Sequence, residues 1–250
     1  MKISTVTVCR NSQATIARTV ESFLDQDYAD KELLVIDGGS TDGTQDIVRG
    51  FGRDAIRLIS EPDAGIYDAM NKGLAHHSGD AVGFLNSDDV YHDRHVLARI
   101  ADGLAQAEAV YGDLVMIFDH ASGHVVREWR SGSFTPGAFR SGWMPPHPTF
   151  YVRRELAART GLFDLQYRIS ADYDFMLRAM EVQRARVRYI PHTLVKFTVG
   201  GMSTAGPLAV MRGNLECLRA RQQHLGAPLL DAAFFMKPLR KLQQLVRTGA

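Results

Sequence analysis

The sequence has few cysteines, no long uncharged run and almost no net charge, and each shortage narrows the class of protein. Its two cysteines, Cys9 and Cys217, lie far apart in a chain of 250 residues. Cys9 ends an apolar run, which favours a buried thiol over half of a disulfide. No uncharged stretch reaches the ~18 residues that a membrane-spanning helix needs. The formal net charge of +1 argues against a nucleic-acid partner.

The N-terminal residues show no apolar segment of signal-peptide length, because residues 1–4 lead straight into a strand pattern. We therefore expect a cytoplasmic protein, either soluble or peripheral on the inner face of the membrane. Hydrophobic residues make up 45% of the chain and charged residues 23%, as in ordinary globular proteins. The length is sufficient to bury a sizeable core.

The first 95 residues alternate between strand and helix patterns. Strands are predicted at 3–9, 32–36, 56–60 and 81–85, and helices at 14–25, 44–50 and 66–77. This order predicts an α/β fold with a Rossmann-like, mostly parallel central sheet flanked by helices. Ligands bind such sheets at the carboxyl ends of the strands. The polar residues at those predicted ends are Asn11, Asp37, Glu61 and residues 86–89.

After residue 95 the pattern changes to short strands, with helices predicted at 96–108 and 170–183. The strands are predicted at 109–111, 114–118, 125–129, 150–152 and 186–190. Residues 131–148 are rich in Gly, Pro, Ser and aromatic residues, which predicts a long irregular loop of the kind that often carries function.

The tail from residue 207 is predicted to be helical, with a break near 226–228. Seven basic and two acidic residues give this tail a net charge of +5. Mixed with apolar residues, that charge favours peripheral contact with an anionic membrane surface. Packing on the rest of the chain or on a second copy, as in a homo-oligomer, is an equal alternative.

Two acidic positions raise the question of a ligand. Asn86, Ser87, Asp88 and Asp89 follow an apolar strand, and their oxygen atoms suit Mg²⁺ or Mn²⁺. The alternative for Ser87 or Asp88 is to cap a short helical turn. Asp37 faces a similar choice between a ligand and an Asx-turn. The residues alone leave both interpretations open.

Six segments in order resemble family 2 glycosyltransferases with the GT-A fold. They are TVTVCRN (5–11), LLVIDGGSTDGT (33–44), EPDAGIYDAMNKG (61–73), GDAVGFLNSDD (79–89), PHPTFYVRR (146–154) and SADYDFMLR (170–178). Segment 61–73 most resembles the branch that builds bacterial surface and exopolysaccharides. The resemblance implies one GT-A domain over 1–205, with a nucleotide-binding half (1–95) and an acceptor-binding half (96–205). A C-terminal helical extension, 206–250, would follow it.

The resemblance also implies roles for individual residues. The nucleotide-sugar would contact Thr7, Val8, Asn11, Asp37, Asp68, Lys72, Asn86 and Ser87. Asp68 and Lys72 share one helix face, a spacing that is also typical of a surface ion pair. Asp88 would be the ligand of Mn²⁺ or Mg²⁺. The family often has Asp where this sequence has Asn86, and an amide is the poorer metal ligand.

Asp172 aligns with the catalytic base of the family. An inverting transferase needs one carboxylate to remove the proton from the acceptor hydroxyl. By position alone, Asp172 and Asp174 are also typical acids of a first helical turn. Weaker candidates for contacts to the acceptor or the donor sugar are His147, Trp143, Arg154, Asp89 and Asp174.

The resemblance therefore implies a metal-dependent, inverting glycosyltransferase. It would move a sugar from a nucleoside-diphosphate sugar, expected to be UDP-linked, to a glycan or lipid-linked acceptor in cell-surface polysaccharide biosynthesis. A nucleotidyltransferase is one alternative, but residues 10–13 lack the glycine-rich basic loop typical of that class. An inactive scaffold or regulator that binds nucleotide-sugars is the other, and Asn86 is the residue that favours it.

Overall fold

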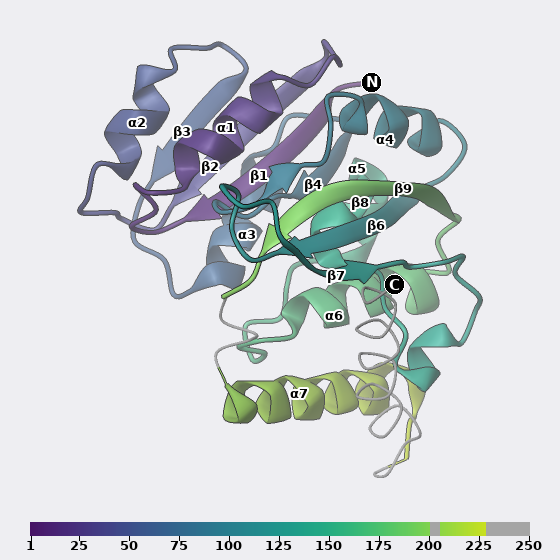
Figure 1. The fold of residues 1–250 in the computed structure, drawn as a ribbon. Helices are drawn as coiled ribbons and strands as arrows, with labels where there is room; N and C mark the ends of the chain where they lie inside the picture. The colour runs from purple at the N-terminus through teal and green to yellow at the C-terminus, as the bar shows by residue number, and fades with distance from the viewer. Residues whose placement is uncertain (201–205, 229–250) are drawn as a thin grey trace.

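The computed structural model describes residues 1–200 and 206–228, and the predicted basic tail beyond residue 228 lies outside them. Its strands are β1 (Ile3–Cys9), β2 (Lys31–Asp37), β3 (Ile56–Ser60), β4 (Ala81–Phe84), β5 (Val90–Tyr91), β6 (Ala109–Ile117), β7 (Val125–Trp129), β8 (Tyr151–Arg153) and β9 (Val187–Thr198). Its α-helices are α1 (Ile16–Leu24), α2 (Thr44–Gly50), α3 (Ile66–His76), α4 (Val96–Leu104), α5 (Arg154–Thr160), α6 (Ala171–Leu177) and α7 (Pro207–Leu225). Two short 3₁₀-helices, η1 (Ala138–Ser141) and η2 (His147–Thr149), and a π-helix, η3 (Arg178–Val182), complete the described elements (Figure 1).

All described strands join one sheet, in the order β3-β2-β1-β4-β8-β6-β9-β5, with β7 paired to β6. The pairs β1–β2, β1–β4 and β2–β3 are parallel. Later in the chain, β8 pairs antiparallel with β4 and β6, whereas β6 and β9 are parallel. The predicted α/β class is confirmed, and the parallel arrangement is most regular in the first 95 residues.

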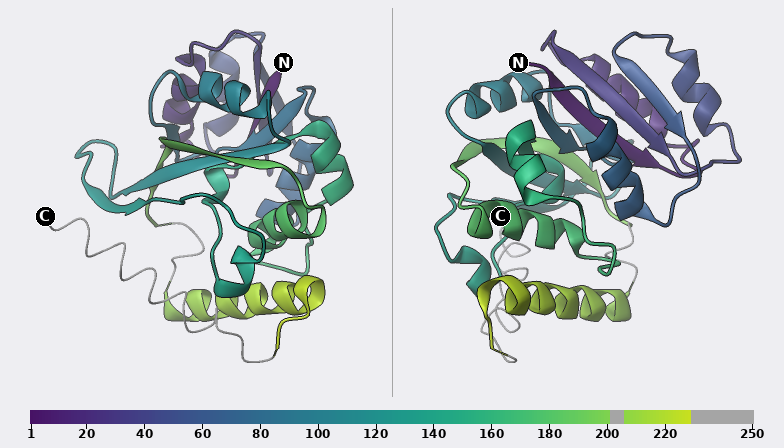
Figure 2. Two further views of the ribbon diagram at one scale, coloured as in Figure 1. Left: turned by 90° about the vertical axis from the view of Figure 1, so that its right-hand side faces the viewer. Right: turned by 180° about the vertical axis from the view of Figure 1, so that it is seen from behind.

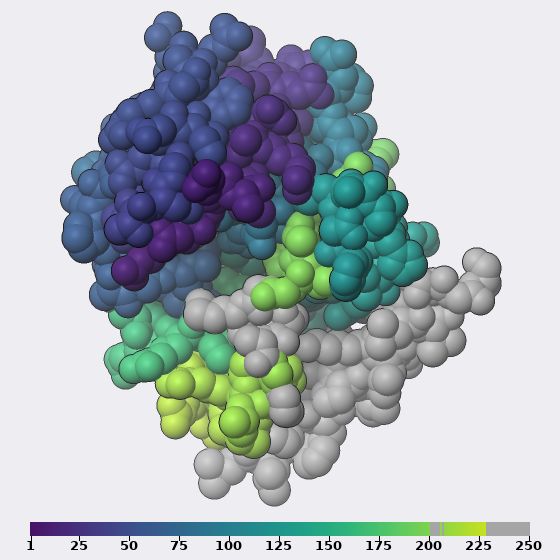
Figure 3. All heavy atoms as spheres, turned by 60° about the vertical axis from the view of Figure 1, so that its left-hand side comes forward, coloured from purple at the N-terminus to yellow at the C-terminus, as the bar shows by residue number. Residues whose placement is uncertain are grey.

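The two faces of the sheet bury separate apolar clusters because side chains alternate along each strand. In β2, Leu33 and Val35 pack in one cluster with α1 and α4, and Leu34 and Ile36 pack in the other with α3 and α6. Figure 2 shows helices on both sides of the sheet. In the space-filling view, the purple and blue N-terminal half meets the light-green end of β9 on one face (Figure 3).

Helix α7 packs beside α6 (Figure 1). Its residues Cys217 and Ala220 belong to the same apolar cluster as the sheet-facing residues of α6. Cys9 and Cys217 are both buried, and neither forms a disulfide in the described part of the chain, as the sequence predicts for Cys9. Among residues 1–200 and 206–228, no helix is long and apolar enough to cross a membrane.

Strand β9 is the element that differs most from its prediction. It continues to Thr198, whereas the sequence pattern predicts an end at Ile190. Pro191 and His192 interrupt the apolar pattern at that point. The pairing with β6 shifts register between Tyr111 and Asp113, and such an irregularity lets a strand accommodate a proline.

Candidate active site

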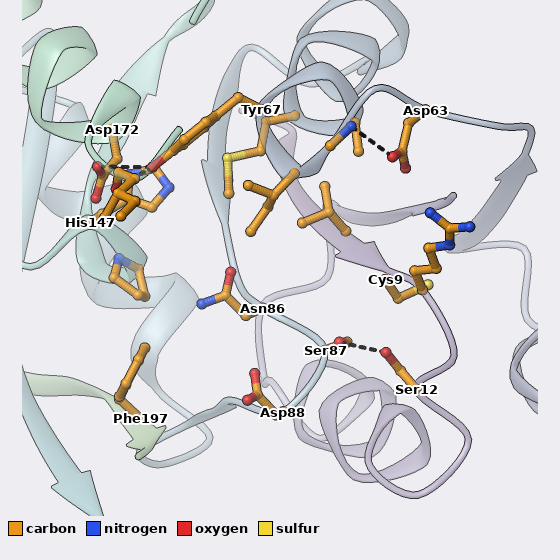
Figure 4. Close-up of a pocket in the computed structure, with 18 residues that line it drawn as sticks. Cys9, Ser12, Asp63, Tyr67, Asn86, Ser87, Asp88, His147, Asp172 and Phe197 are labelled. Atoms are coloured by element: carbon orange, nitrogen blue, oxygen red, sulfur yellow. Dashed lines mark hydrogen bonds between the residues drawn. The ribbon is translucent and has the colours of Figure 1, made fainter. Parts of the chain in front are cut away.

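A pocket of about 440 Å³ lies at the carboxyl ends of β1 and β4. Side chains reach it from the loop after β1, the first turns of α3, the loop after β4, η2, the end of β9 and the start of α6. This is the edge at which parallel strands place ligands. Figure 4 shows Asp172 and His147 on one side of the pocket, Cys9, Ser12 and Asp63 on the other, and Asn86 and Asp88 between them.

On the first side, Tyr67 of α3 lies beside Asp172 of α6. Its hydroxyl donates to the carbonyl oxygen of Ile169 at 2.6 Å and lies 3.3 Å from Oδ1 of Asp172. Burial, and then the nearby charge of Asp172, raise the pKa of Tyr67 well above its usual value. The phenol therefore stays protonated and acts as a hydrogen-bond donor at neutral pH.

His147 lies next to Asp172 in the pocket wall (Figure 4) and is 8% exposed. Its ring stacks on Phe84 at 5.4 Å. Burial lowers the pKa of the imidazole, although Asp172 opposes this shift, so the ring is neutral at pH 7. Within the described part of the chain, neither ring nitrogen has a hydrogen-bond partner. His147 is thus a neutral polar group beside the carboxylate.

The adjacent carboxylates after β4 take different environments. Asp89 is fully buried and accepts hydrogen bonds from the backbone N–H of Thr198 at 3.0 Å and from Nδ2 of Asn86 at 2.9 Å. Burial, and then repulsion from Asp88, raise the pKa of Asp89 well above its usual value. Asp89 therefore ties the loop to β9, while Asp88 lines the pocket.

The carboxylate of Asp88 lines the pocket and forms no ion pair with a basic side chain of the described residues. Burial raises its pKa, and the partial charge of His120 acts in the opposite direction. None of the ion pairs formed by residues 1–200 and 206–228 includes Asp88. A carboxylate that loses hydration and forms no ion pair is a natural partner for a bound cation.

The far side of the pocket is polar but carries no reactive thiolate. The hydroxyls of Ser12 and Ser87 share a hydrogen bond of 3.0 Å, which joins the loops after β1 and β4. Asp63 accepts a 3.0 Å hydrogen bond from the N–H of Gly65, just before α3. Burial and then Asp37 raise the pKa of Cys9 to about 12, so its thiol is protonated at neutral pH.

The residues around Asp88 fit a divalent cation that arrives with its ligand. No three His, Cys, Asp or Glu side chains of the described residues gather into a metal-binding group. Mg²⁺ is often held by one or two carboxylates and completes its shell with water and substrate phosphates. The carboxylate of Asp88, beside Asn86 and Ser87, suits that kind of shared site.

The family model for glycosyl transferase family 2 matches residues 4–162. The chain belongs to glycosyl transferase family 2. A glycosyltransferase of PGL/p-HBAD biosynthesis from Mycobacterium bovis (strain BCG / Pasteur 1173P2) is 32% identical over 200 residues, covering 77% of this chain and 75% of that one. An uncharacterized glycosyltransferase from Mycobacterium tuberculosis (strain CDC 1551 / Oshkosh) is 34% identical over 185 residues, covering 71% and 68%.

Two solved structures share the fold of the chain. S. aureus TarS 1–349 in complex with UDP-GlcNAc has a TM-score of 0.69 and 18% identity, covering 93% of this chain and 69% of that one. The mannosyltransferase PcManGT from Pyrobaculum calidifontis, in complex with GDP-Man and Mn²⁺, has a TM-score of 0.69 and 19% identity, covering 98% and 69%. The predicted family and GT-A fold are confirmed.

The pocket of this glycosyltransferase contains six of the predicted residues, from four parts of the chain. They are Val8, Asn86, Ser87, Asp88, His147 and Asp172. Their contacts with a donor or an acceptor stay predictions.

Three of the residues that were predicted to contact the nucleotide-sugar, Thr7, Asn11 and Asp37, do not line the pocket. Thr7 is buried within β1. Asn11 accepts a 2.9 Å hydrogen bond from the N–H of Thr41 through its side-chain oxygen. Asp37 is fully buried; burial would raise its pKa, but hydrogen bonds from Ser40 and Ser60 lower it overall. Nucleotide contacts for these three stay predictions.

Asp68 and Lys72 form the ion pair that their spacing alone predicts. Nζ of Lys72 lies 3.8 Å from Oδ2 of Asp68 and 2.9 Å from Oε1 of Glu61, and it donates to the carbonyl oxygen of Pro62 at 2.7 Å. Neither Asp68 nor Lys72 lines the pocket. A diphosphate would have to compete with two carboxylates for Lys72.

Arg154 and Trp143, predicted to contact the acceptor or the donor sugar, do not line the pocket, and those contacts stay predictions. The guanidinium of Arg154 donates to the carbonyl oxygen of Gly79, just before β4, whereas the pocket lies after β4. β8 runs antiparallel to β4, so the chain reaches Arg154 at the end of β4 that lies opposite the pocket. Trp143 donates to the carbonyl oxygen of Ser131 at 2.9 Å and packs edge-on against Phe139, away from the pocket.

Asp174 and Asp89, the other weaker candidates for a sugar contact, do not line the pocket either, and those contacts stay predictions. Asp174 is 1% exposed and pairs with Nε of Arg178 at 2.8 Å and Nε2 of His224 at 2.9 Å. It therefore joins α6 to α7. Asp89 has the buried role described above. Both carboxylates have protein partners that occupy their oxygen atoms.

Several pocket residues of the transferase were missed by sequence reasoning. Tyr67 and Phe197 line the pocket, but neither carries a charge or a cap pattern. Phe197 also falls in the part of β9 that was not predicted. Arg10 and Ser12 sit in the same strand-end loop as Asn11, so their position was the available signal.

Proposed function

We propose that this glycosyltransferase inverts the anomeric centre as it moves a sugar from a nucleoside-diphosphate sugar to a hydroxyl of a glycan or lipid-linked acceptor. The proposal places the reaction in cell-surface polysaccharide biosynthesis. It is supported most by one observation: Asp88 and Asp172, the predicted metal ligand and base, line the same pocket.

The leaving diphosphate is assigned to the Asp88 side of the pocket. Mn²⁺ or Mg²⁺ held by Asp88 would offset the charge that develops on the diphosphate when the sugar departs. The Asn86 amide and the Ser87 hydroxyl lie beside Asp88 in the pocket wall and offer hydrogen bonds to the donor. The Ser12–Ser87 hydrogen bond supports a fixed position for this loop.

Asp172 is assigned the role of general base. One of its carboxylate oxygens takes the proton of the acceptor hydroxyl as that oxygen bonds to the anomeric carbon. The bond from that carbon to the diphosphate breaks on the opposite face, which inverts the configuration. Tyr67, protonated at neutral pH, and neutral His147 flank the carboxylate without neutralising its charge.

The donor nucleotide is proposed to be UDP, and GDP is the alternative to be tested. Solved proteins of this fold were described in complex with UDP-GlcNAc and with GDP-Man. Peripheral membrane contact would come from the basic tail, whose residues beyond 228 lie outside the described part of the chain. That contact and a homo-oligomer stay predictions.

Two substitutions test the assigned roles. We expect Asp88→Ala and Asp172→Asn each to reduce transfer by at least about 10²-fold, the scale of general acid–base catalysis. Asp46→Asn is the matched control, because its side chain is 87% exposed on α2 and should leave transfer unchanged. Normal turnover in both variants, measured as release of nucleoside diphosphate with acceptor present, would show that these roles are wrong.

A further inference from the structure

Glu216 of α7 is a buried carboxylate that the proposed reaction does not use. It is 4% exposed. It accepts hydrogen bonds from three consecutive backbone N–H groups: Arg168 at 3.1 Å, Ile169 at 2.8 Å and Ser170 at 2.9 Å. A buried charge is unfavourable unless it is paired and hydrogen-bonded, and Arg212 supplies the opposite charge at 3.2 Å.

The segment that Glu216 holds, residues 168–170, leads directly into α6 and Asp172. Two further contacts fix the same segment. The hydroxyl of Ser170 donates to the carbonyl oxygen of Gly213 on α7 at 3.0 Å. The hydroxyl of Tyr67, on α3, donates to the carbonyl oxygen of Ile169 at 2.6 Å. The backbone before Asp172 is thus held from α7 on one side and from α3 on the other.

The close approach of α7 to this segment depends on a glycine. A Cβ atom at Gly213 would lie 3.2 Å from Cγ2 of Ile169 and 3.4 Å from Oγ of Ser170. The small residue at this position lets the helix backbone come near enough for Glu216 to reach all three N–H groups. Both α7 and Asp172 lie beyond the residues that the family model matches.

We propose that Glu216 is a positioning residue that sets the place of the Asp172 carboxylate in the pocket. The inference rests on the proposed function, because it takes Asp172 as the base. This proposal gives α7 a part in the reaction. The helix carries Glu216, the carboxylate that accepts hydrogen bonds from the three backbone N–H groups just before the base. Small displacements of a catalytic group are costly, since an error of about 1 Å can lower a rate about 10²-fold.

Glu216→Gln is the test substitution. Gln keeps the size of the side chain but replaces one carboxylate oxygen by an NH₂ group, which donates instead of accepting. At least one of the three backbone N–H groups therefore loses its hydrogen bond. We expect kcat to fall by about tenfold to 10²-fold. The KM for the donor should change less than about twofold, because Asp88, Asn86 and Ser87, the residues assigned to the donor, are untouched. Arg219→Gln, an exposed change on the same helix, is the control and should leave both constants unchanged.

A second measurement separates positioning from a general loss of structure. In the Asp172→Asn background, Glu216→Gln should lower the residual rate no further, because a displaced base costs nothing once the base is absent. Ser170→Ala, which removes the hydroxyl hydrogen bond from the same segment to Gly213 of α7, should reproduce the fall in kcat if Glu216→Gln does not fold. Loss of donor affinity together with kcat, or additive losses in the double variant, would show a structural role only.

The outcomes distinguish this inference from the proposed function. Full activity of Asp172→Asn would show that Asp172 is not the base, and the positioning role of Glu216 would then be wrong as well. An inactive Asp172→Asn beside a fully active Glu216→Gln would overturn the positioning role alone. Amide hydrogen exchange of residues 168–170 should be faster in Glu216→Gln than in the wild type, and unchanged exchange would contradict the contacts on which the inference rests.

Discussion

Replacing Gly83 by alanine tests the strand register that places the pocket. Gly83 lies in β4, opposite Tyr151 of β8. A Cβ atom at Gly83 would lie 2.5 Å from Cδ1, Cε1 and Cζ of the Tyr151 ring. The ring is fully buried, and its hydroxyl is 2.6 Å from that of Tyr91 and 3.2 Å from that of Thr5. It has little freedom to move aside.

The expected cost of Gly83→Ala follows from these contacts. Overpacking of a buried site costs about 1–3 kcal/mol. A displaced ring also loses hydroxyl hydrogen bonds worth about 1 kcal/mol each. Together these terms give about 3–5 kcal/mol, a large part of the roughly 5–15 kcal/mol by which domains are stable. For a chain of this size, Tm should fall by about 6–20 °C.

Thermal and urea unfolding measure this loss, and Gly50→Ala is the matched control. A Cβ atom at Gly50, the last residue of α2, meets nothing within 4 Å, so that variant should lie within about 1 kcal/mol of the wild type. If Gly83→Ala were as stable as Gly50→Ala, the pairing of Gly83 with Tyr151 would be wrong. The position of the loop from Asn86 to Asp88 would then need revision too.

Two further predictions concern the buried carboxylate of Glu32 and the side chain of Trp143. Burial would raise the pKa of Glu32, but Ser4, Ser78 and Lys2 lower it from 4.5 to about 2. The ionised carboxylate of Glu32 therefore stabilises the folded state above pH 4.5, and this stabilisation is lost as the pH falls towards 2. Glu32→Gln should lower the free energy of unfolding by about 2 kcal/mol at pH 7. Urea unfolding should show a smaller difference between this variant and the wild type at about pH 3. An equal difference at the two pH values would contradict the lowered pKa of Glu32. Trp143→Phe should cost about 1 kcal/mol through its lost hydrogen bond and leave turnover unchanged, whereas a large fall in turnover would return Trp143 to the site.

The first half of the fold could be predicted because its signals are local. β3 and α2 have the bounds that the sequence predicts, since apolar runs and flanking turn residues define both. The end of β9 could not be predicted in this way. Its continuation past Pro191 depends on a register shift against β6, which no local pattern records.

The candidate site was predictable where one residue follows one strand or opens one helix. Asp88 and Asp172 are positions of that kind, and both line the pocket. Arg154 shows the limit: its place in segment 146–154 predicts a contact with the acceptor or the donor sugar, but the antiparallel direction of β8 places it at the far end of β4. Glu216 has no local signal, because its partners at 168–170 lie on a distant segment.

The central claim is that Asp88 binds a cation together with the donor diphosphate, while Asp172 acts on the acceptor. Calorimetric titration of UDP and GDP into the wild type, Asp88→Ala and Asp172→Asn, with Mn²⁺ and then with EDTA, tests it most directly. The account predicts that one nucleotide binds at least about tenfold more tightly with Mn²⁺, a difference of about 1.4 kcal/mol. That gain should disappear in Asp88→Ala and persist in Asp172→Asn. Equal binding in Mn²⁺ and EDTA, or loss of binding in Asp172→Asn, would contradict the account.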